Sequence, residues 1–126
     1  MNIRIEDGLP VVEIKIVYKG KEKILRSVLL DTGSSNTIFD VDSVVDIGLD
    51  IDTTGGKARR MYGVGGESEL CYEQEVENLL IEDYLLNKFT IQLGMTKENY
   101  GFDCILGVDF MIKNGINLDF KNLLIK

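Results

Sequence analysis

The stretch VLLDTGSS, residues 28–35, places a carboxylate directly after three apolar residues. Burying an unpaired carboxylate is costly, so Asp31 needs hydrogen-bond partners at the end of such a strand. Thr32 and Ser34 offer hydroxyl groups, and Gly33 permits a sharp turn that brings backbone amides close to the carboxylate. An ordinary Asx turn at a strand end would explain the same residues, so a functional interpretation depends on the rest of the chain.

Two further segments follow in an order that strengthens this interpretation. The segment MYGVGG, residues 61–66, is rich in glycine and lies between two stretches that could pair as strands. Such a segment is typical of the tip of a β-hairpin. Later in the chain, Ile105-Leu106-Gly107 places a glycine directly after a short apolar strand.

Alternation of apolar and polar residues dominates the chain and predicts a mainly β fold. Apolar and polar residues alternate within 11–18 and within 22–30, and a polar turn at 19–21 separates the two segments. This pattern predicts a β-hairpin. Further strands are expected at 73–80, at 89–93 after a turn near 82–83, at 105–106, and in a hairpin over 116–125 with its turn at 121–122.

Two short helices are also expected. One is capped by Asp40 or Asp42 and ended by Gly48, and the other is capped by Asp109 and ended near Asn114. The segments 53–60 and 96–101 are expected to be loops. With a single proline and no Ser/Gly-rich linker, residues 1–126 are expected to form one domain.

Composition excludes several classes of function. The absence of histidine excludes Ser-His and Cys-His nucleophile pairs and metal sites built on imidazole. A net charge of −7 argues against a nucleic-acid partner, because phosphate backbones are bound by clustered cations. Cys71 and Cys104 lack metal-site spacing and are expected to be buried and reduced, so neither a metal nor a cofactor is expected.

The same sequence argues against membrane association. No apolar run approaches the ~20 residues that a membrane-spanning helix needs. Acidic residues also lie near the start of the chain, where a signal peptide would be apolar. We therefore expect a cytoplasmic protein.

Taken together, LLDTGSS (29–35) and ILGVDFM (105–111) resemble the retropepsin-like aspartic proteases, the single-domain relatives of retroviral proteases. The second segment is close to the I-L-G-x-D-F-L pattern of the cellular branch, and the resemblance spans roughly residues 11–125. It implies a closed β-barrel, the single lobe of the acid-protease fold, with one or two short helices.

The resemblance implies a role for each matching residue. Asp31 matches the catalytic aspartate, and Thr32 matches the residue whose hydroxyl bonds across a dimer axis. Gly33 matches the glycine whose amide supports the carboxylates. The segment 105–107 (Ile105, Leu106 and Gly107) resembles a strand that threads beneath the active-site loop, where glycine lets the two backbones approach closely.

Substrate binding is expected from the active-site loop and from a flap that folds over the bound peptide. The residues concerned are Ser34, Ser35, Tyr62, Gly63, Val64, Gly65 and Gly66. Two features depart from the viral pattern. Ser35 and Asn36 replace acids that bind the substrate backbone in many retroviral enzymes, and the motifs are spaced further apart.

The implied activity is that of an aspartic endopeptidase acting on a peptide or protein substrate. Only one Asp-Thr-Gly is present, because Asp52-Thr53-Thr54-Gly55 has an extra residue and follows no apolar pair. A pair of catalytic aspartates would then need a homodimer in which each copy supplies Asp31. Two alternatives remain: a catalytically silent module for dimerisation or peptide binding, and a structural barrel in which the motif is accidental.

Ser34 suggests one further property of such an enzyme. Its hydroxyl could donate a hydrogen bond to an outer oxygen of Asp31, which favours the charged form of a carboxylate. The aspartate pair would then titrate lower than with alanine at this position. Activity is expected to peak in acidic solution, and Ser34→Ala is expected to move the active window to higher pH.

Overall fold

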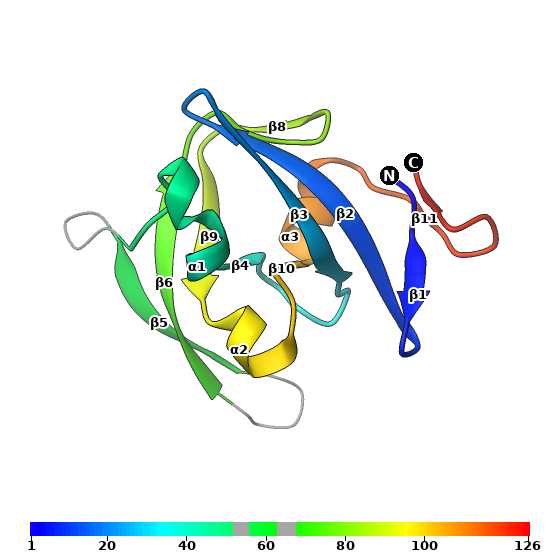
Figure 1. Cartoon of the computed structure of the whole chain (residues 1–126), viewed down its shortest axis with the longest axis horizontal. Helices are drawn as coiled ribbons and strands as arrows, with labels where there is room; N and C mark the ends of the chain where they lie inside the picture. The colour runs from blue at the N-terminus through cyan, green and yellow to red at the C-terminus, as the bar shows by residue number, and fades with distance from the viewer. Residues whose placement is uncertain (52–55, 63–67) are drawn as a thin grey trace.

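The computed structural model describes residues 1–51, 56–62 and 68–126. Its longest feature is the hairpin of β2 (Leu9–Tyr18) and β3 (Lys21–Leu30), which was predicted from alternation (Figure 1). The two turn residues, Lys19 and Gly20, have φ angles of 49° and 80°. A lysine followed by a glycine suits this left-handed turn, because glycine adopts positive φ without steric cost.

The other strands extend this hairpin into one large sheet. They are β1 (Arg4–Glu6), β4 (Ile38–Asp40), β5 (Lys57–Tyr62), β6 (Ser68–Val76), β7 (Leu79–Ile81), β8 (Tyr84–Leu86), β9 (Phe89–Gly94) and β10 (Cys104–Leu106). The ten strands pair in the order β5-β6-β9-β4-β10-β3-β2-β7-β8, with β1 added to β2. The predicted mainly β architecture is confirmed. Closure into a barrel stays a prediction, because no pairing joins β5 to β8 within the described residues.

The end of the chain forms a separate hairpin. Strands β11 (Leu118–Asp119) and β12 (Leu124–Ile125) pair with each other, as predicted for this segment. A bridge from Asn2 to Leu124 places both termini at the same side of the molecule (Figure 1).

Helices are short and exceed the predicted number. The described residues contain α1 (Val41–Val44), the 3₁₀ turn η1 (Val45–Ile47), α2 (Thr96–Tyr100) and α3 (Val108–Lys113). Asp40 caps α1 by accepting a hydrogen bond from the amide of Ser43, and Gly48 ends η1 with φ of 97°, as predicted. No helix in the described part of the chain is both long and apolar enough to span a bilayer.

Several boundaries predicted from the sequence were wrong. Residues 57–60, expected as loop, belong to β5 and pair with β6. The single strand expected at 73–80 is divided into β6 and β7, because Asn78 turns the chain with φ of 59°. The loop expected at 96–101 is largely α2, and Asp109 lies inside α3, whose N-cap is Gly107.

Apolar residues fill two clusters. The main core unites β2, β3, β9 and the helices, and its largest fully buried side chains include Ile14, Ile16, Leu25, Phe39, Leu93 and Phe110. A smaller cluster joins Ile38, Cys71 and Ile105, with Leu29 and Met61 packed against it. Both cysteines, Cys71 and Cys104, are buried and neither forms a disulfide bond, as predicted.

Candidate active site

Asp31 lies at the end of β3, where that strand runs beside β10. The two strands are parallel, with Leu30 opposite Leu106. The amide of Asp31 continues the pairing by donating to the carbonyl of Leu106 over 3.0 Å. The catalytic candidate is therefore fixed by a strand that comes much later in the sequence.

The chain turns immediately after Asp31 and returns two amides to it. Gly33 N donates to Asp31 Oδ1 at 2.9 Å, and Ser34 N donates to the Asp31 carbonyl at 3.1 Å. A Cβ at Gly33 would lie 3.2 Å from that same carboxylate oxygen, so a side chain there would crowd the carboxylate. The amide of Gly33 therefore holds one oxygen of the Asp31 carboxylate in place.

Gly107 lies directly beneath the active-site loop, residues 31–37. A Cβ on Gly107 would meet the carbonyl oxygens of Asn36 at 2.5 Å and Ser34 at 2.8 Å, distances that real Cβ atoms essentially never show. Val108 N then donates to Ser34 O at 2.8 Å. The predicted close approach of Ile105-Leu106-Gly107 to the loop is present, and only glycine fits at its end.

The C-terminal end of this loop is held by a clamp of hydrogen bonds between Thr37 and Asp109, which was not predicted from the sequence. Thr37 is fully buried; its amide and hydroxyl donate to the two carboxylate oxygens of Asp109 at 3.0 and 2.8 Å. The same hydroxyl accepts a hydrogen bond from Gly107 N at 3.1 Å. Asp109 therefore binds the active-site loop instead of capping α3, which corrects the prediction.

Ser34 does not make the contact predicted for it. Its hydroxyl donates to the carbonyl of Asn36 at 2.8 Å, within the loop, and not to an outer oxygen of Asp31. The carbonyl of Asn36 lies two residues away and satisfies the hydroxyl locally, as short polar side chains commonly do in turns. The proposed influence of Ser34 on the titration of the aspartate loses its structural basis.

The remaining loop residues face outward. Thr32, Gly33 and Ser35 are exposed, and Asp31 is partly buried. In the described part of the chain, no hydrogen bond is made by the Thr32 hydroxyl. The tip of the active-site loop is therefore accessible to another molecule.

The predicted flap is described only in part. Strands β5 and β6 form a hairpin, with Tyr62 opposite Ser68. Gly63, Val64, Gly65 and Gly66 lie outside the described residues. Met61 packs with Ile38 and Ile105, so the arm of this hairpin lies over the strands that carry the active-site loop.

A pocket of about 380 Å³ lies between the loop and this hairpin. It is lined by Ser35, Asn36, Arg59, Arg60, Met61, Glu73 and Gln92. Of these, only Ser35 was predicted to bind substrate. Arg59, Glu73 and Gln92 gave no signal in the sequence, because their placement depends on how β5, β6 and β9 pair.

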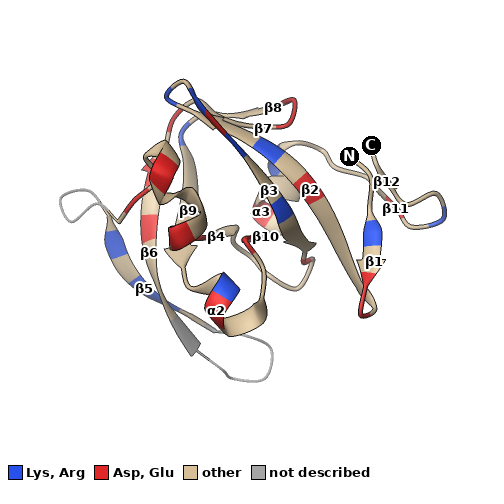
Figure 2. Cartoon of the chain, in the orientation of Figure 1, with Lys and Arg blue, Asp and Glu red and all other residues tan. Residues whose placement is uncertain are grey.

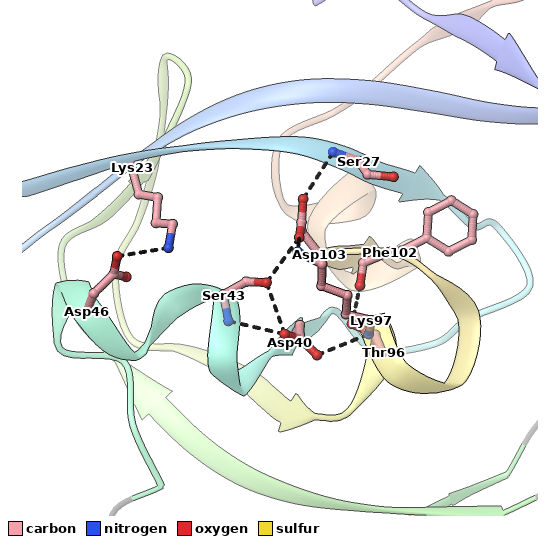
Figure 3. Close-up of polar contacts among 9 residues, drawn as sticks. All are labelled: Lys23, Ser27, Asp40, Ser43, Asp46, Thr96, Lys97, Phe102 and Asp103. Carbon is pink, nitrogen blue, oxygen red and sulfur yellow. Dashed lines mark hydrogen bonds and ion pairs between the residues drawn. The ribbon is translucent and has the colours of Figure 1, made fainter.

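A second polar cluster supports the strands behind the site (Figure 3). Asp40 accepts hydrogen bonds from Ser43 and from the amide of Lys97, and Asp103 accepts them from Ser43 and from the amide of Ser27. These bonds join β3, β4, α1 and α2, so the cluster is structural. Among the described residues, no group of three His, Cys, Asp or Glu side chains is placed to hold a metal ion.

Cys104 is unsuited to nucleophilic chemistry. Its pKa is raised well above the ordinary thiol value by burial, and further by the nearby carboxylates of Asp103 and Asp109. A thiol with a raised pKa carries little of the reactive thiolate at neutral pH.

Comparison with solved structures identifies the fold. A retropepsin-like aspartic protease from Rickettsia conorii matches with a TM-score of 0.67 and 18% identity, over 98% of this chain and 86% of that chain. The retroviral protease-like domain of Ddi1 from Leishmania major matches with a TM-score of 0.60 and 14% identity, over 92% and 86%. EIAV protease, in complex with an inhibitor, matches with a TM-score of 0.55 and 17% identity, over 90% and 95%.

At the level of sequence, neither a protein-family model nor a curated protein matches the chain. The structural matches nevertheless cover nearly the whole chain, and all three solved structures are retroviral-type proteases or protease-like domains. The chain has a retropepsin-like fold, as its two motifs predicted.

Proposed function

We propose that the chain is an aspartic endopeptidase that acts as a homodimer, in which each copy contributes Asp31 to one shared site. The observation that carries this proposal is the construction of the active-site loop. Its carboxylate is held by Gly33 N, its backbone is anchored to Leu106, and it rests on a glycine that tolerates no side chain. A loop built this tightly around a partly exposed carboxylate suits catalysis better than simple structural support.

The exposed loop tip supports the dimer. A single aspartate cannot supply both the acid and the base that peptide hydrolysis with an activated water requires. Thr32, Gly33 and Ser35 are accessible at the tip and could face the same residues of a second copy across a two-fold axis. The Thr32 hydroxyl would then bond to the opposite loop and hold the two carboxylates together.

The proposed mechanism follows from the behaviour of paired carboxylates. Two carboxylates about 3 Å apart cannot both ionise, so the pair shares one proton. The ionised carboxylate takes a proton from water, and that water attacks the carbonyl carbon of the scissile peptide. The protonated carboxyl donates its proton to the developing oxyanion, and the amine leaves after it receives a proton from the pair.

The test is the substitution Asp31→Asn, with Asp83→Asn as its matched control. The amide has the same shape as the carboxylate but cannot act as the base, so peptide cleavage should fall by at least about 1,000-fold. Asp83 is exposed in the turn between β7 and β8, far along the chain from the loop, so its variant should cleave like the wild type. Cleavage is measured with a fluorogenic peptide library between pH 4 and 7.

Two results would contradict the proposal. Cleavage that is undiminished in Asp31→Asn would remove the aspartate from the mechanism. A wild type that dimerises and binds peptides but cleaves none of them across this pH range would indicate the silent binding module instead.

A further inference from the structure

One row of cross-strand neighbours leads from the candidate active site into the pocket. Leu29, Ile105, Ile38, Gln92 and Glu73 are successive partners on β3, β10, β4, β9 and β6. Directly paired residues place their side chains on the same face of a sheet. The row begins two residues before the catalytic candidate, is apolar over three strands, and ends with two polar residues at the pocket.

Gln92 is the unusual member of this row. It is only 2% exposed, and its Oε1 is buried without a hydrogen-bond partner among the described residues. A buried acceptor that lacks a donor is destabilising, and such groups are rare in folded proteins. Because Gln92 lines the pocket, a bound group that donates a hydrogen bond would remove this penalty.

The charges around the pocket limit what that donor can be. Arg59 forms an ion pair with Glu73, and Arg60 also lines the pocket, so its walls carry two guanidinium groups and one carboxylate. The basic residues lie along β5 (Figure 2). The two guanidinium groups repel the cationic side chain of a lysine or arginine placed beside them, so the donor should be neutral. The side-chain amide of Asn36 can donate to an acceptor on the same bound group.

A side-chain carboxamide satisfies both requirements, because its NH₂ donates and its carbonyl accepts. We infer that this pocket is a specificity subsite that takes a glutamine or asparagine side chain of the substrate peptide. The inference rests on the proposed function, because it assumes that a peptide lies along the active-site loop. Gln92 is its specificity-determining residue. The ion pair between Arg59 and Glu73 holds these two side chains in place on the adjacent wall of the pocket.

The experiment compares peptides that differ at one position, tested in turn at each position near the scissile bond. The variable residue is Gln, Met, Glu or Lys, where Met matches the size of Gln without its polar group. For the wild type we expect one position at which Gln is preferred over Met by about tenfold or more in kcat/KM. In Gln92→Met, that preference should vanish, so that the Gln and Met peptides have similar kcat/KM values.

A matched control is available on the neighbouring strand. Gln74 lies on β6, and its Oε1 is also buried without a partner, but it is not among the residues that line the pocket. Gln74→Met should therefore keep the preference for Gln. A second variant, Gln92→Glu, adds an acceptor with a negative charge and should shift the preference toward Lys, so the test does not depend on a single substitution.

The subsite and the proposed function can fail separately. Binding of the same peptides to Asp31→Asn, measured by fluorescence anisotropy, reports the preference without cleavage. In one outcome, the wild type cleaves no peptide, yet the Gln peptides bind Asp31→Asn best and lose that advantage in the double variant Asp31→Asn with Gln92→Met. The protease proposal then fails and the subsite inference stands. If peptides are cleaved or bound without a Gln preference, or with a preference that Gln92→Met leaves unchanged, the subsite inference is overturned.

Discussion

Thr37 shows at the scale of single residues how the active-site loop is held in place. Its hydroxyl accepts from Gly107 N and donates to Asp109, so one buried group joins the loop, the end of β10 and the start of α3. Thr37→Val keeps the shape but leaves the Gly107 amide without a partner and removes one of the two hydrogen bonds that Asp109 Oδ1 accepts. We expect this variant to lose about 1–3 kcal/mol of unfolding free energy. Peptide cleavage should fall with it, because the loop is less firmly positioned.

Urea denaturation measures this loss, and Thr37→Ser is the control. Serine retains the hydroxyl, so it should restore most of the stability and activity. Equal behaviour of the Val and Ser variants would show that the hydroxyl does not hold the loop.

Ser34 gives a second prediction at this scale, and here the structure reverses the expectation from sequence. Because its hydroxyl donates to Asn36 O, its removal should not change the titration of the aspartate pair. The pH profile of kcat/KM for Ser34→Ala should superimpose on that of the wild type after scaling. A shift of the profile to higher pH would show that the hydroxyl turns toward Asp31 in the active enzyme.

At the residue scale, the sequence predicted what is local. The Asp31 turn is encoded within three residues, and its geometry follows from a carboxylate that accepts a hydrogen bond from the amide of the glycine two residues later. The clamp between Thr37 and Asp109 joins residues 72 positions apart. A threonine is common at the start of a strand and an aspartate at the start of a helix. Neither residue therefore indicated that it contacts the other.

The same distinction applies at the scale of elements. The β2–β3 hairpin is evident from alternation, because one face of each strand is buried in the core. Helix α2 has no such pattern; it begins where Asp40 accepts the amide of Lys97 and ends at Gly101, with φ of 83°. Strand β5 is polar and exposed, and only its pairing with β6 makes it a strand. Elements that depend on distant partners could not be predicted from their own residues.

The hairpin of β11 and β12 should lose stability in strong acid. The pKa of Asp119 is well below its ordinary value because the Asn122 side chain and backbone donate to it and Lys126 pairs with it. A carboxylate with a lowered folded pKa contributes stability above its unfolded pKa, about 3.9, and this contribution is lost as pH falls through the folded pKa. The hairpin should therefore stay intact in the mildly acidic range proposed for catalysis and fray only below about pH 4.

NMR titration of the Asn122 amide measures this transition. In Asp119→Asn, the dependence on pH should disappear because the titrating group is gone. Fraying of the wild-type hairpin that begins between pH 5 and 7 would contradict the assignment.

At the scale of the whole molecule, charge opposes the proposed dimer. Acidic residues outnumber basic ones, giving each copy a net charge of −7, and they are distributed over several strands and helices (Figure 2). Long-range repulsion between two acidic copies is screened within about 8 Å at physiological ionic strength. The dimer Kd should therefore fall as sodium chloride rises from about 10 to 150 mM.

Sedimentation equilibrium over this salt series would follow the change from a 14.2 kDa species toward one of twice that mass. Specific cleavage activity should rise in parallel, because the proposed site exists only in the dimer. A 14.2 kDa species alone at micromolar concentration in all buffers, or a dimer that weakens with added salt, would contradict the proposed assembly.

The parallel pairing of β3 with β10 also affects how the protein acquires its site. These strands lie at opposite ends of the sequence, and pairings of this kind are slow to form because a long loop must close before any contact compensates for the lost entropy. During synthesis the chain emerges from its N-terminus, so Asp31 is exposed well before its anchor at Leu106 exists. An incomplete chain therefore contains Asp31 but lacks Leu106 and Gly107, which hold the active-site loop in place. Assembly of the candidate active-site loop is thus delayed until most of the domain has been made.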